Sequence, residues 1–423
     1  MSGERDKLLI VGASARAAAH SALRAGITPI AVDLFGDRDL AQVARVLPVR
    51  RWPGDVPALA RTAPAGPWMY TGALENHPRI VAAVSSRRTL WGNPASVLRR
   101  VRDPFCLRDA LLNATLPALE LRTADDPPPS DGSWVLKPRR SAGGRGIQRW
   151  TAAAVPATRR EPHFFQRYAE GTAISAVFVG HSSSTALVGI SQQLVGLRLL
   201  SAGPFAYCGS IGPFNLPPTA ARQVEHTGIT LGSRFGLRGL FGIDFVLSEG
   251  AAWPVELNPR YTASVEVLEH ANGIPLLDWH RRAFERDADL PNSPPEAAGR
   301  DNSGDRAASQ STSPASVAKA ILYAPCDLHV TRLGPFVAAD PIRSMPAYTD
   351  LPHDGARIRQ GRPVCTVLAQ ATTRSDCLGL LDERLARLRS ALGLAAAPPV
   401  SIEPGDCGEA CGRSGPARRA GGL

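Results

Sequence analysis

Two short apolar segments near residue 250 constrain the fold most, because each carries polar side chains where a strand is usually buried. They are Gly242–Leu247 and Pro254–Arg260, separated by a short polar break. The polar side chains are Asp244 in the first segment and Glu256, Asn258 and Arg260 in the second. Side chains alternate faces along a strand, so those of the second segment share one face, and a paired strand can set the first carboxylate beside them. Two carboxylates and one amide form an incomplete site of the kind that Mg²⁺ (or Mn²⁺) completes with substrate phosphates, so the two segments predict a metal-binding β-hairpin.

Lysine is rare in this chain, and the position of one lysine is informative. Of the 48 basic residues only Lys7, Lys137 and Lys319 are lysine, and all the others are arginine. Where a lysine persists inside the apolar segment Trp134–Pro138, a compact point charge is needed that a flat guanidinium does not replace. A glycine-rich turn, Arg139–Ile147, follows directly. Glycines let backbone N–H groups close on phosphate oxygens, and because the lysine precedes them the segment is not a Walker A loop.

The first 94 residues predict a small doubly wound α/β domain. Residues 8–12 read as a buried parallel strand, an alanine-rich helix follows as far as residue 25, and a second strand covers 29–32. The connecting loop Gly12–Arg16 resembles a dinucleotide-binding loop only loosely, because the later glycines of that fingerprint are missing. A tight strand-to-helix turn is the favoured interpretation, and binding of a substrate fragment there stays open.

The rest of the chain predicts an α+β body followed by less structured segments. A helix is expected over 95–113, an antiparallel pair of strands over 173–179 and 184–191, and a helix over 219–235 before the acidic hairpin. The predicted divisions are an N-terminal domain (1–94), a nucleotide-binding domain (95–285) with a small lid subdomain (about 115–170), a flexible linker (286–316), a C-terminal piece packing on the body (317–394) and a disordered tail (395–423). Linker and tail are rich in Pro, Ser, Gly and polar residues, with few large apolar ones.

Composition bounds the class of protein. At 423 residues with 44% hydrophobic content, the chain can bury a substantial core. No apolar run is long enough to cross a bilayer and the first residues lack an apolar signal core, so a cytoplasmic protein without a membrane partner is expected. Seven scattered cysteines favour reduced thiols. The net charge of +10 comes from dispersed arginines, which favours a solvated surface and an anionic nucleotide ligand over a nucleic acid partner.

Taken in order, these motifs resemble the ATP-grasp superfamily. The resemblance rests on the lysine strand, the glycine loop, a later strand ending in Gln-Arg-Tyr, and the hairpin with Asp and Glu-Leu-Asn-Pro-Arg. It spans residues 8–285 and, more weakly, 317–392. It is closest to the carboligases related to biotin carboxylase, a subgroup with ligases similar to tyramine-glutamate ligase of methanofuran synthesis. The resemblance implies an ATP-grasp fold behind an N-terminal doubly wound, pre-ATP-grasp domain.

The resemblance also implies a role for each matching side chain. Lys137 contacts the α- and β-phosphates of ATP, and the glycines form a flap over them. The implied cofactor-binding residues are Lys137, Ser141, Gly143, Gly144, Gly146, Gln166, Arg167 and Tyr168, the last three lining the adenine mostly through backbone groups. The implied metal ligands are Asp244, Glu256 and Asn258. Arg260 is the implied catalytic cation near the transferring phosphate and acyl group.

One departure from the superfamily pattern concerns a second lysine, which the superfamily generally places before the central domain. The segment Arg99–Phe105 has none, and Arg102 is the candidate replacement. The chain also lacks a Met-Lys-Met sequence for biotin attachment, so a carboxylase would need a separate carrier.

The implied function is an ATP-dependent, ADP-forming ligase that joins a small-molecule carboxylate to an amine. The closest resemblance implies glutamate and an amine, although the residues leave both substrates and the oligomeric state open. The alternative is an ATP-binding regulatory or scaffold protein with a degenerate site, suggested by the missing lysine. Outside these motifs, Lys319 is expected to be an ordinary strand-end charge. Glu266 and Glu269 are expected to be surface groups on a helix, although either could meet the amine.

Overall fold

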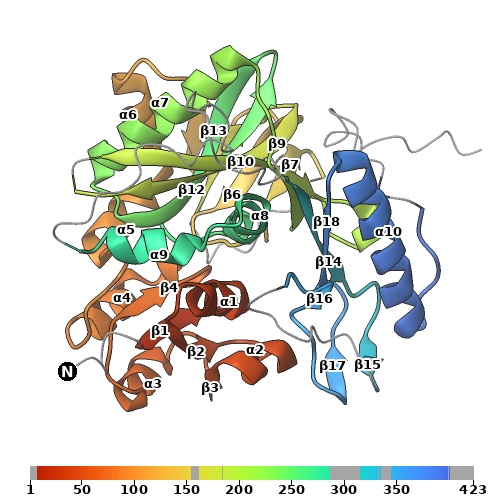
Figure 1. Cartoon of the computed structure of the whole chain (residues 1–423). Helices are drawn as coiled ribbons and strands as arrows, with labels where there is room; N and C mark the ends of the chain where they lie inside the picture. Colours follow the sequence, from red (N-terminus) through yellow and green to blue (C-terminus); the bar gives the residue numbers. More distant parts are fainter. Residues whose placement is uncertain are drawn as a thin grey trace, which may run out of the picture.

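The computed structural model describes residues 7–153, 162–182, 184–285, 315–331, 333–334, 344–398 and 400. The chain has a mixed α/β and α+β architecture, with a large antiparallel sheet running through its centre (Figure 1). Residues 286–314 of the predicted linker and 401–423 of the predicted tail lie outside the described residues. Among the helices of the described part, none is long and apolar enough to cross a membrane.

The N-terminal domain is a parallel sheet of order β3-β2-β1-β4 with helices around it. Its strands are β1 (Lys7–Gly12), β2 (Thr28–Asp33), β3 (Arg45–Pro48) and β4 (Trp68–Tyr70). Its helices are α1 (Arg16–Arg24), α2 (Arg38–Val43), α3 (Val56–Thr62), the short η1 (Leu74–Asn76) and α4 (Pro78–Ser85). Strands β1 and β2 are buried along almost their whole length, as expected when helices cover both faces. The predicted strand-helix-strand opening is confirmed.

The helix predicted over 95–113 is wrong in one respect, because the structure has two helices there. They are α5 (Ala95–Val101) and α6 (Pro104–Asn113). Proline lacks an N–H and disfavours helical geometry in the residue before it, so it begins a helix more readily than it continues one. The Asp103 side chain accepts a hydrogen bond from the N–H of Phe105 at 3.0 Å and thereby caps the second helix.

A small antiparallel sheet of order β5-β8-β6-β7 lies within the predicted lid. Its strands are β5 (Leu121–Thr123), β6 (Asp131–Pro138), β7 (Gln148–Thr151) and β8 (His163–Arg167). Its own core is small, built from Trp134, Leu136 and Phe165 with Trp150 packed against them. This cluster is smaller than the clusters of the N-terminal domain and the central sheet.

The central sheet has eight strands in the order β13-β12-β9-β10-β11-β14-β18-β16. Its strands are β9 (Thr172–Gly180), β10 (Thr185–Val195), β11 (Tyr207–Gly212), β12 (Gly239–Ser248), β13 (Ala251–Asn258), β14 (Ser316–Tyr323), β16 (Tyr348–Thr349) and β18 (Pro363–Ala371). The remaining elements are η2 (Arg198–Leu200), α7 (Pro218–Phe235), α8 (Ala263–Asn272), α9 (Leu276–Arg282), α10 (Arg374–Ala391) and the two-stranded pair β15 (Leu328–Val330) and β17 (Ala356–Ile358). The predicted antiparallel pair and the predicted 219–235 helix are confirmed as β9–β10 and α7.

The C-terminal piece does more than pack on the body, because β14 pairs with β11 and so extends the central sheet. In Figure 1, α8 and α9 lie between this sheet and the N-terminal domain, and α10 stands at one side. One hydrophobic cluster joins Leu8 and Ala19 of the N-terminal domain to Val177 and Leu268 of the body. Ordered structure also reaches past the predicted start of the tail at residue 395, since Val400 is buried and donates its N–H to Asp382 at 2.8 Å.

Candidate active site

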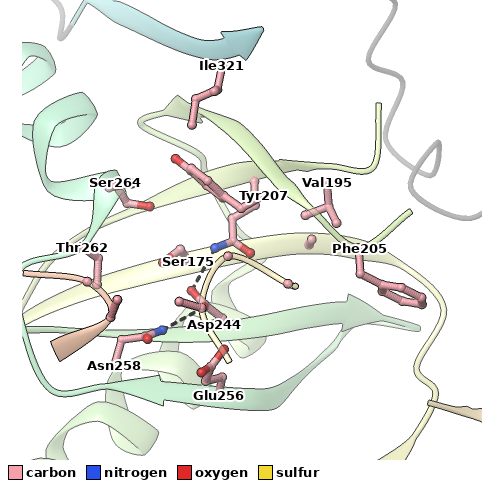
Figure 2. A pocket seen from close by; sticks show the side chains of 18 of the residues that line it. Ser175, Val195, Phe205, Tyr207, Asp244, Glu256, Asn258, Thr262, Ser264 and Ile321 are labelled. Atoms are coloured by element: carbon pink, nitrogen blue, oxygen red, sulfur yellow. Dashed lines mark hydrogen bonds between the residues drawn. The ribbon is translucent and has the colours of Figure 1, made fainter. Parts of the chain in front are cut away.

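The hairpin predicted around residue 250 is formed by β12 and β13. Asp244 lies opposite Glu256 in the register, and Gly242 lies opposite Asn258. Figure 2 shows the two carboxylates and the amide gathered on neighbouring strands. One oxygen of Asp244 accepts the Asn258 amide at 3.0 Å, and the other accepts the amide of Gln193 from β10 at 2.9 Å. The oxygen-rich cluster therefore exists, with Gln193 as a member that the sequence did not indicate.

Charge on the hairpin is unevenly shared between its two carboxylates. Burial, and then the neighbouring Glu256, raise the pKa of Asp244 to about 6. Burial would also raise the pKa of Glu256, but Arg102 and Lys137 outweigh it and hold that pKa below its ordinary value. Arg102 Nη1 lies 2.6 Å from a Glu256 oxygen. Glu256 is thus the better-stabilised anion, and Asp244 gains most from an added cation.

Lys137 lies on β6 and points toward the same cluster. Its Nζ donates to the side-chain oxygen of Gln166 at 3.0 Å and to the carbonyl of Val255 at 3.3 Å. Burial lowers the pKa of Lys137, and the Glu256 carboxylate partly offsets this effect. The ammonium group therefore bridges the small sheet and the β12–β13 hairpin, which are far apart in sequence.

The glycine-rich loop after β6 folds back against strand β11. Gly143, Gly144 and Gly146 all have positive φ, between 61° and 78°, where glycine is strongly preferred. The Tyr207 N–H donates to the carbonyl of Gly143 at 3.2 Å. The carbonyl of Ser141 accepts a bond from Arg102 at 3.3 Å, so the loop is tied to the cation that contacts the hairpin.

Arg260 follows the hairpin and is held on both sides by acceptors. Its Nε donates to Glu75 at 2.9 Å, its Nη2 to the side-chain oxygen of Asn258 at 3.1 Å, and its Nη1 to the carbonyl of Tyr261 at 3.1 Å. Burial would lower the pKa of Arg260, but Glu75 overcomes this and raises it. Glu75 is 1% exposed and belongs to η1 of the N-terminal domain, so only the tertiary structure brings it here.

These side chains line one cavity of about 580 Å³. It is bounded by the small sheet, the central sheet, the N-terminal domain and the C-terminal piece. Every residue predicted for the site lines it except Ser141 and Gly146. Glu75 and Arg102 do not line the cavity themselves. Glu75 contacts Arg260, and Arg102 contacts Glu256.

Comparison with known proteins agrees with this geometry. Residues 103–264 match the family described as "ATP-grasp domain". These residues form an ATP-grasp domain. The match begins at the cap of α6 and ends in α8, and it contains the lysine strand, the glycine loop and the acidic hairpin.

Two curated relatives match this part of the chain. The carbamoyl phosphate synthase large chain of Thermomicrobium roseum is 22% identical over 153 residues, 34% of this chain and 14% of that protein. An uncharacterized protein of Methanocaldococcus jannaschii is 30% identical over 109 residues, 26% of this chain and 24% of that protein. The chain therefore spans less than a quarter of the length of either relative.

Solved structures resemble the ATP-grasp domain together with the elements around it. The biotin carboxylase of Campylobacter jejuni, in complex with β,γ-ATP, matches with a TM-score of 0.65 at 14% identity. The match covers 90% of this chain and 91% of the biotin carboxylase chain. The N5-carboxyaminoimidazole synthase of Aspergillus clavatus, in complex with ADP and 5-aminoimidazole ribonucleotide, has a TM-score of 0.63 at 15% identity and covers 91% and 99%. At such identities the likeness shows a shared fold.

The segment predicted to line the adenine, Gln166–Tyr168, is bonded to the rest of the chain through both backbone and side-chain groups. The N–H groups of Arg167 and Tyr168 already donate to the carbonyls of Glu120 and Ser133, at 2.8 and 3.0 Å. The Gln166 side chain is buried, and its oxygen accepts a hydrogen bond from Lys137 of the ATP-grasp domain. The Arg167 guanidinium turns outward to the hydroxyl of Ser133 at 3.1 Å.

Three charges outside the predicted site were expected to be ordinary surface groups, and those expectations are wrong. Glu266, Glu269 and Lys319 are 1%, 2% and 5% exposed. Glu266 pairs with Arg16 of α1 and, at 2.7 Å, with Lys319 of β14. Helix α8 presents these acids inward against the N-terminal domain, a packing that its own sequence does not indicate.

The loop after β1 is the tight turn that the sequence favoured, and it also reaches the cavity. Ala13, Ser14 and Arg16 line the cavity. The turn is held by Asp33, whose carboxylate accepts the N–H of Ala15 at 2.6 Å. An acidic side chain at the end of β2 thus replaces the glycine-specific geometry of a dinucleotide loop.

Proposed function

We propose that this chain is an ATP-dependent ligase that activates a carboxylate as an acyl phosphate and joins it to an amine. One observation carries the proposal: within an ATP-grasp domain, a buried ammonium, a glycine loop and an oxygen-rich hairpin converge on one cavity. The solved structures that share the fold include complexes with ATP, ADP or an ATP analogue, which supports ATP as the nucleotide.

The hairpin fits Mg²⁺ by its chemistry. Asp244, Glu256 and Asn258 offer oxygen donors on adjacent strands, and Asp244 carries a carboxylate whose negative charge lacks an ion-pair partner within 4 Å among the described residues. Two carboxylates and an amide therefore suit an ion that phosphate oxygens help to ligate. Bound there, Mg²⁺ neutralises charge on the transferring phosphate.

The chain's own groups then position the reactants. Lys137 holds negative phosphate oxygens as a point charge, while Gly143 and Gly144 let the loop close over them and exclude water. The substrate carboxylate attacks the γ-phosphorus, the bond to the bridging oxygen breaks, and ADP leaves. The amine nitrogen attacks the acyl carbon, the carbon–oxygen bond breaks, and phosphate leaves together with one proton from the nitrogen.

We propose that Arg260 stabilises the negative charge that develops when the amine attacks the acyl carbon. Its guanidinium is fixed by Glu75 and Asn258, and it lines the cavity beside the hairpin. A fixed cation at that place stabilises the oxyanion of the tetrahedral intermediate without reorganising during the reaction. We propose Arg102 as the replacement for the second lysine of the superfamily, since it links Glu256 to the glycine loop.

The carboxylate and the amine are left as chemical classes. The resemblance to tyramine-glutamate ligase supports glutamate as a first candidate carboxylate. The Aspergillus enzyme's complex with 5-aminoimidazole ribonucleotide supports an amine as the second substrate. The predicted division into an N-terminal domain, a nucleotide-binding domain and a C-terminal piece is part of this proposal, because all three line the cavity.

The test is substrate-dependent ADP release, measured with a panel of amino acids and amines. Wild type should release ADP with at least one pair, and Glu256→Gln should abolish the signal while the thermal unfolding midpoint stays within a few degrees. Glu225→Gln, an exposed acid on α7, is the matched control and should behave as wild type. Tight Mg-ATP binding without ADP release from any pair would instead support the regulatory alternative.

A further inference from the structure

The cavity has a second charged end, opposite in character to the phosphate-binding groups. It lies where the N-terminal domain, α8 and the C-terminal piece meet. Its charged members are the cations Arg16 and Lys319 and the carboxylates Asp33, Asp37, Asp39, Glu266 and Asp350. Arg16, Lys319, Asp37 and Asp350 line the cavity, and the other three acids lie behind its lining; we refer to the seven residues as the acidic end.

Four of these carboxylates have partners that account for their burial. Glu266 bonds to both cations, and Asp350 accepts from the Arg16 guanidinium at 3.0 and 3.2 Å. Asp33 accepts three backbone N–H groups at 2.6 to 2.8 Å. Asp39 accepts two, at 2.8 and 3.0 Å. These bonds consume most of the Arg16 donors, so the guanidinium is not available to recognise an anionic substrate.

Asp37 is the exception. It is 8% exposed and lines the cavity, yet among the described residues no donor or ion-pair partner contacts its carboxylate. It stands at the N-cap of α2, where an Asp side chain usually bonds to the helix N–H groups, but it makes no such bond. Burial, followed by Asp350, Asp33 and Asp39, raises the pKa of Asp37. At a pKa of about 9 the side chain is protonated at neutral pH while no cation is bound, and a cation bound beside it stabilises the ionised form.

We propose that Asp37 binds the amine substrate of the ligase in its positively charged, ammonium form and accepts one proton from it, which leaves a neutral nitrogen whose lone pair attacks the acyl carbon. The inference rests on the proposed function, and it adds the charge class of the amine. Phe35, which is 48% exposed and also lines the cavity, gives an apolar wall for the body of the amine and a ring face for its charge. A carboxylate on the same molecule would meet Asp37 and Asp350, so the site selects amines over amino acids.

A metal ion does not explain the acidic end equally well. The described residues contain no group of three or more His, Cys, Asp or Glu side chains arranged to hold a metal ion. The oxygens of the carboxylates beside Asp37 already accept hydrogen bonds from backbone N–H groups or from Arg16. A single ammonium, which needs one carboxylate and a few weaker acceptors, fits the remaining space.

The experiment compares three small probes of matched shape by calorimetric titration into the full chain with Mg-ATP analogue present. They are 2-phenylethylamine, which is cationic, L-phenylalanine, which adds a carboxylate, and 3-phenylpropionate, which is anionic; 1,4-diaminobutane serves as a second cation. At least one cation should bind, and the probes with a carboxylate should bind at least about tenfold more weakly, the usual effect of losing one charge-assisted bond.

Asp37→Asn should weaken binding of the cation by about tenfold or more and leave the Kd for the Mg-ATP analogue within about twofold. Because the unliganded Asp37 side chain is protonated at neutral pH and makes no cap hydrogen bond, the thermal unfolding midpoint should hold, whereas a purely structural role would lower it. The matched control is Asp354→Asn, a half-exposed acid outside the cavity, which should bind as wild type.

Three results would overturn the inference while the ligase proposal stands: equal binding of the cation by Asp37→Asn, tighter binding of a probe with a carboxylate, or no binding of either cation to wild type that binds the nucleotide. Failure of wild type to bind the Mg-ATP analogue would instead refute the proposed function itself, so the two failures are distinguishable.

Discussion

Two neighbouring glycines provide a matched test of the glycine loop. Gly143 and Gly144 have similar backbone conformations, with φ of 61° and 78°. A Cβ added at residue 143 would meet no atom within 4 Å. A Cβ added at residue 144 would lie 1.7 Å from the carbonyl oxygen of Phe205. The two alanine substitutions thus share the same backbone strain and differ in one contact.

The expected magnitudes follow from this difference. An alanine in the left-handed region costs about 1 to 2 kcal/mol at either position, which bounds the effect of Gly143→Ala on Mg-ATP affinity at roughly 30-fold. In Gly144→Ala the distance to the Phe205 oxygen must also widen from 1.7 Å to at least 3.0 Å. The loop then moves away from β11, and loss of a charge-assisted bond to phosphate weakens binding by a further factor of roughly 10 to 100.

The assay is calorimetric titration of Mg-ATP into wild type and both variants, with thermal unfolding measured in parallel. Gly144→Ala should bind at least about tenfold more weakly than Gly143→Ala, while their unfolding midpoints stay similar. Equal affinities of the two variants would refute the idea that the loop must approach β11 to hold the phosphates. A large, selective loss of thermal stability in Gly144→Ala would assign the contact to folding instead.

Two further predictions concern buried charge. Glu266→Ala should lower the free energy of unfolding by about 3 to 5 kcal/mol, because it leaves the buried Arg16 uncompensated; chemical denaturation measures this, and a loss below about 1 kcal/mol, as for a surface pair, would contradict it. His280 should make the chain acid-sensitive, because burial lowers its pKa to about 4 and its Nδ1 must stay unprotonated to accept the N–H of Leu240 at 2.9 Å. Unfolded chains therefore bind more protons below pH 6.5, and stability should fall by about 2 kcal/mol between pH 7 and pH 5, levelling off below pH 4. Unfolding curves across this range check the slope, which His280→Gln should reduce.

The parts of the fold that the sequence predicted well have local causes. Alternating polar and apolar residues set the β12–β13 hairpin, and the scarcity of lysine drew attention to Lys137. The register that places Asp244 opposite Glu256 was less predictable, because it depends on a one-residue irregularity between Asp244 and Phe245, after which Phe245 lies opposite Pro254. The match to an ATP-grasp domain over residues 103–264 covers this same local information.

The parts that the sequence did not predict depend on contacts between distant segments. Nothing near Glu75 marks it as the partner of Arg260, because the two lie 185 positions apart. Glu266 and Lys319 read as surface charges on their own helix and strand, since their burial arises only when α8 packs on α1 and β14 joins β11. Buried ion pairs of this kind leave no periodic pattern, because each partner alone breaks the hydrophobic pattern of its element.

The ion pairs behind the cavity explain how one chain can combine a rigid acceptor end with a movable nucleotide end. Arg16, Glu266 and Lys319 come from the N-terminal domain, the body and the C-terminal piece, and they lock these parts together with contacts that are costly to break. The small sheet that carries Lys137 has a core of only a few side chains, and its loop is tied down by single hydrogen bonds. Under the proposed function, we expect closure over ATP to move the small sheet against the acidic end. It follows that removing the C-terminal piece would take away Lys319 and Asp350 and disturb the amine end before the nucleotide end.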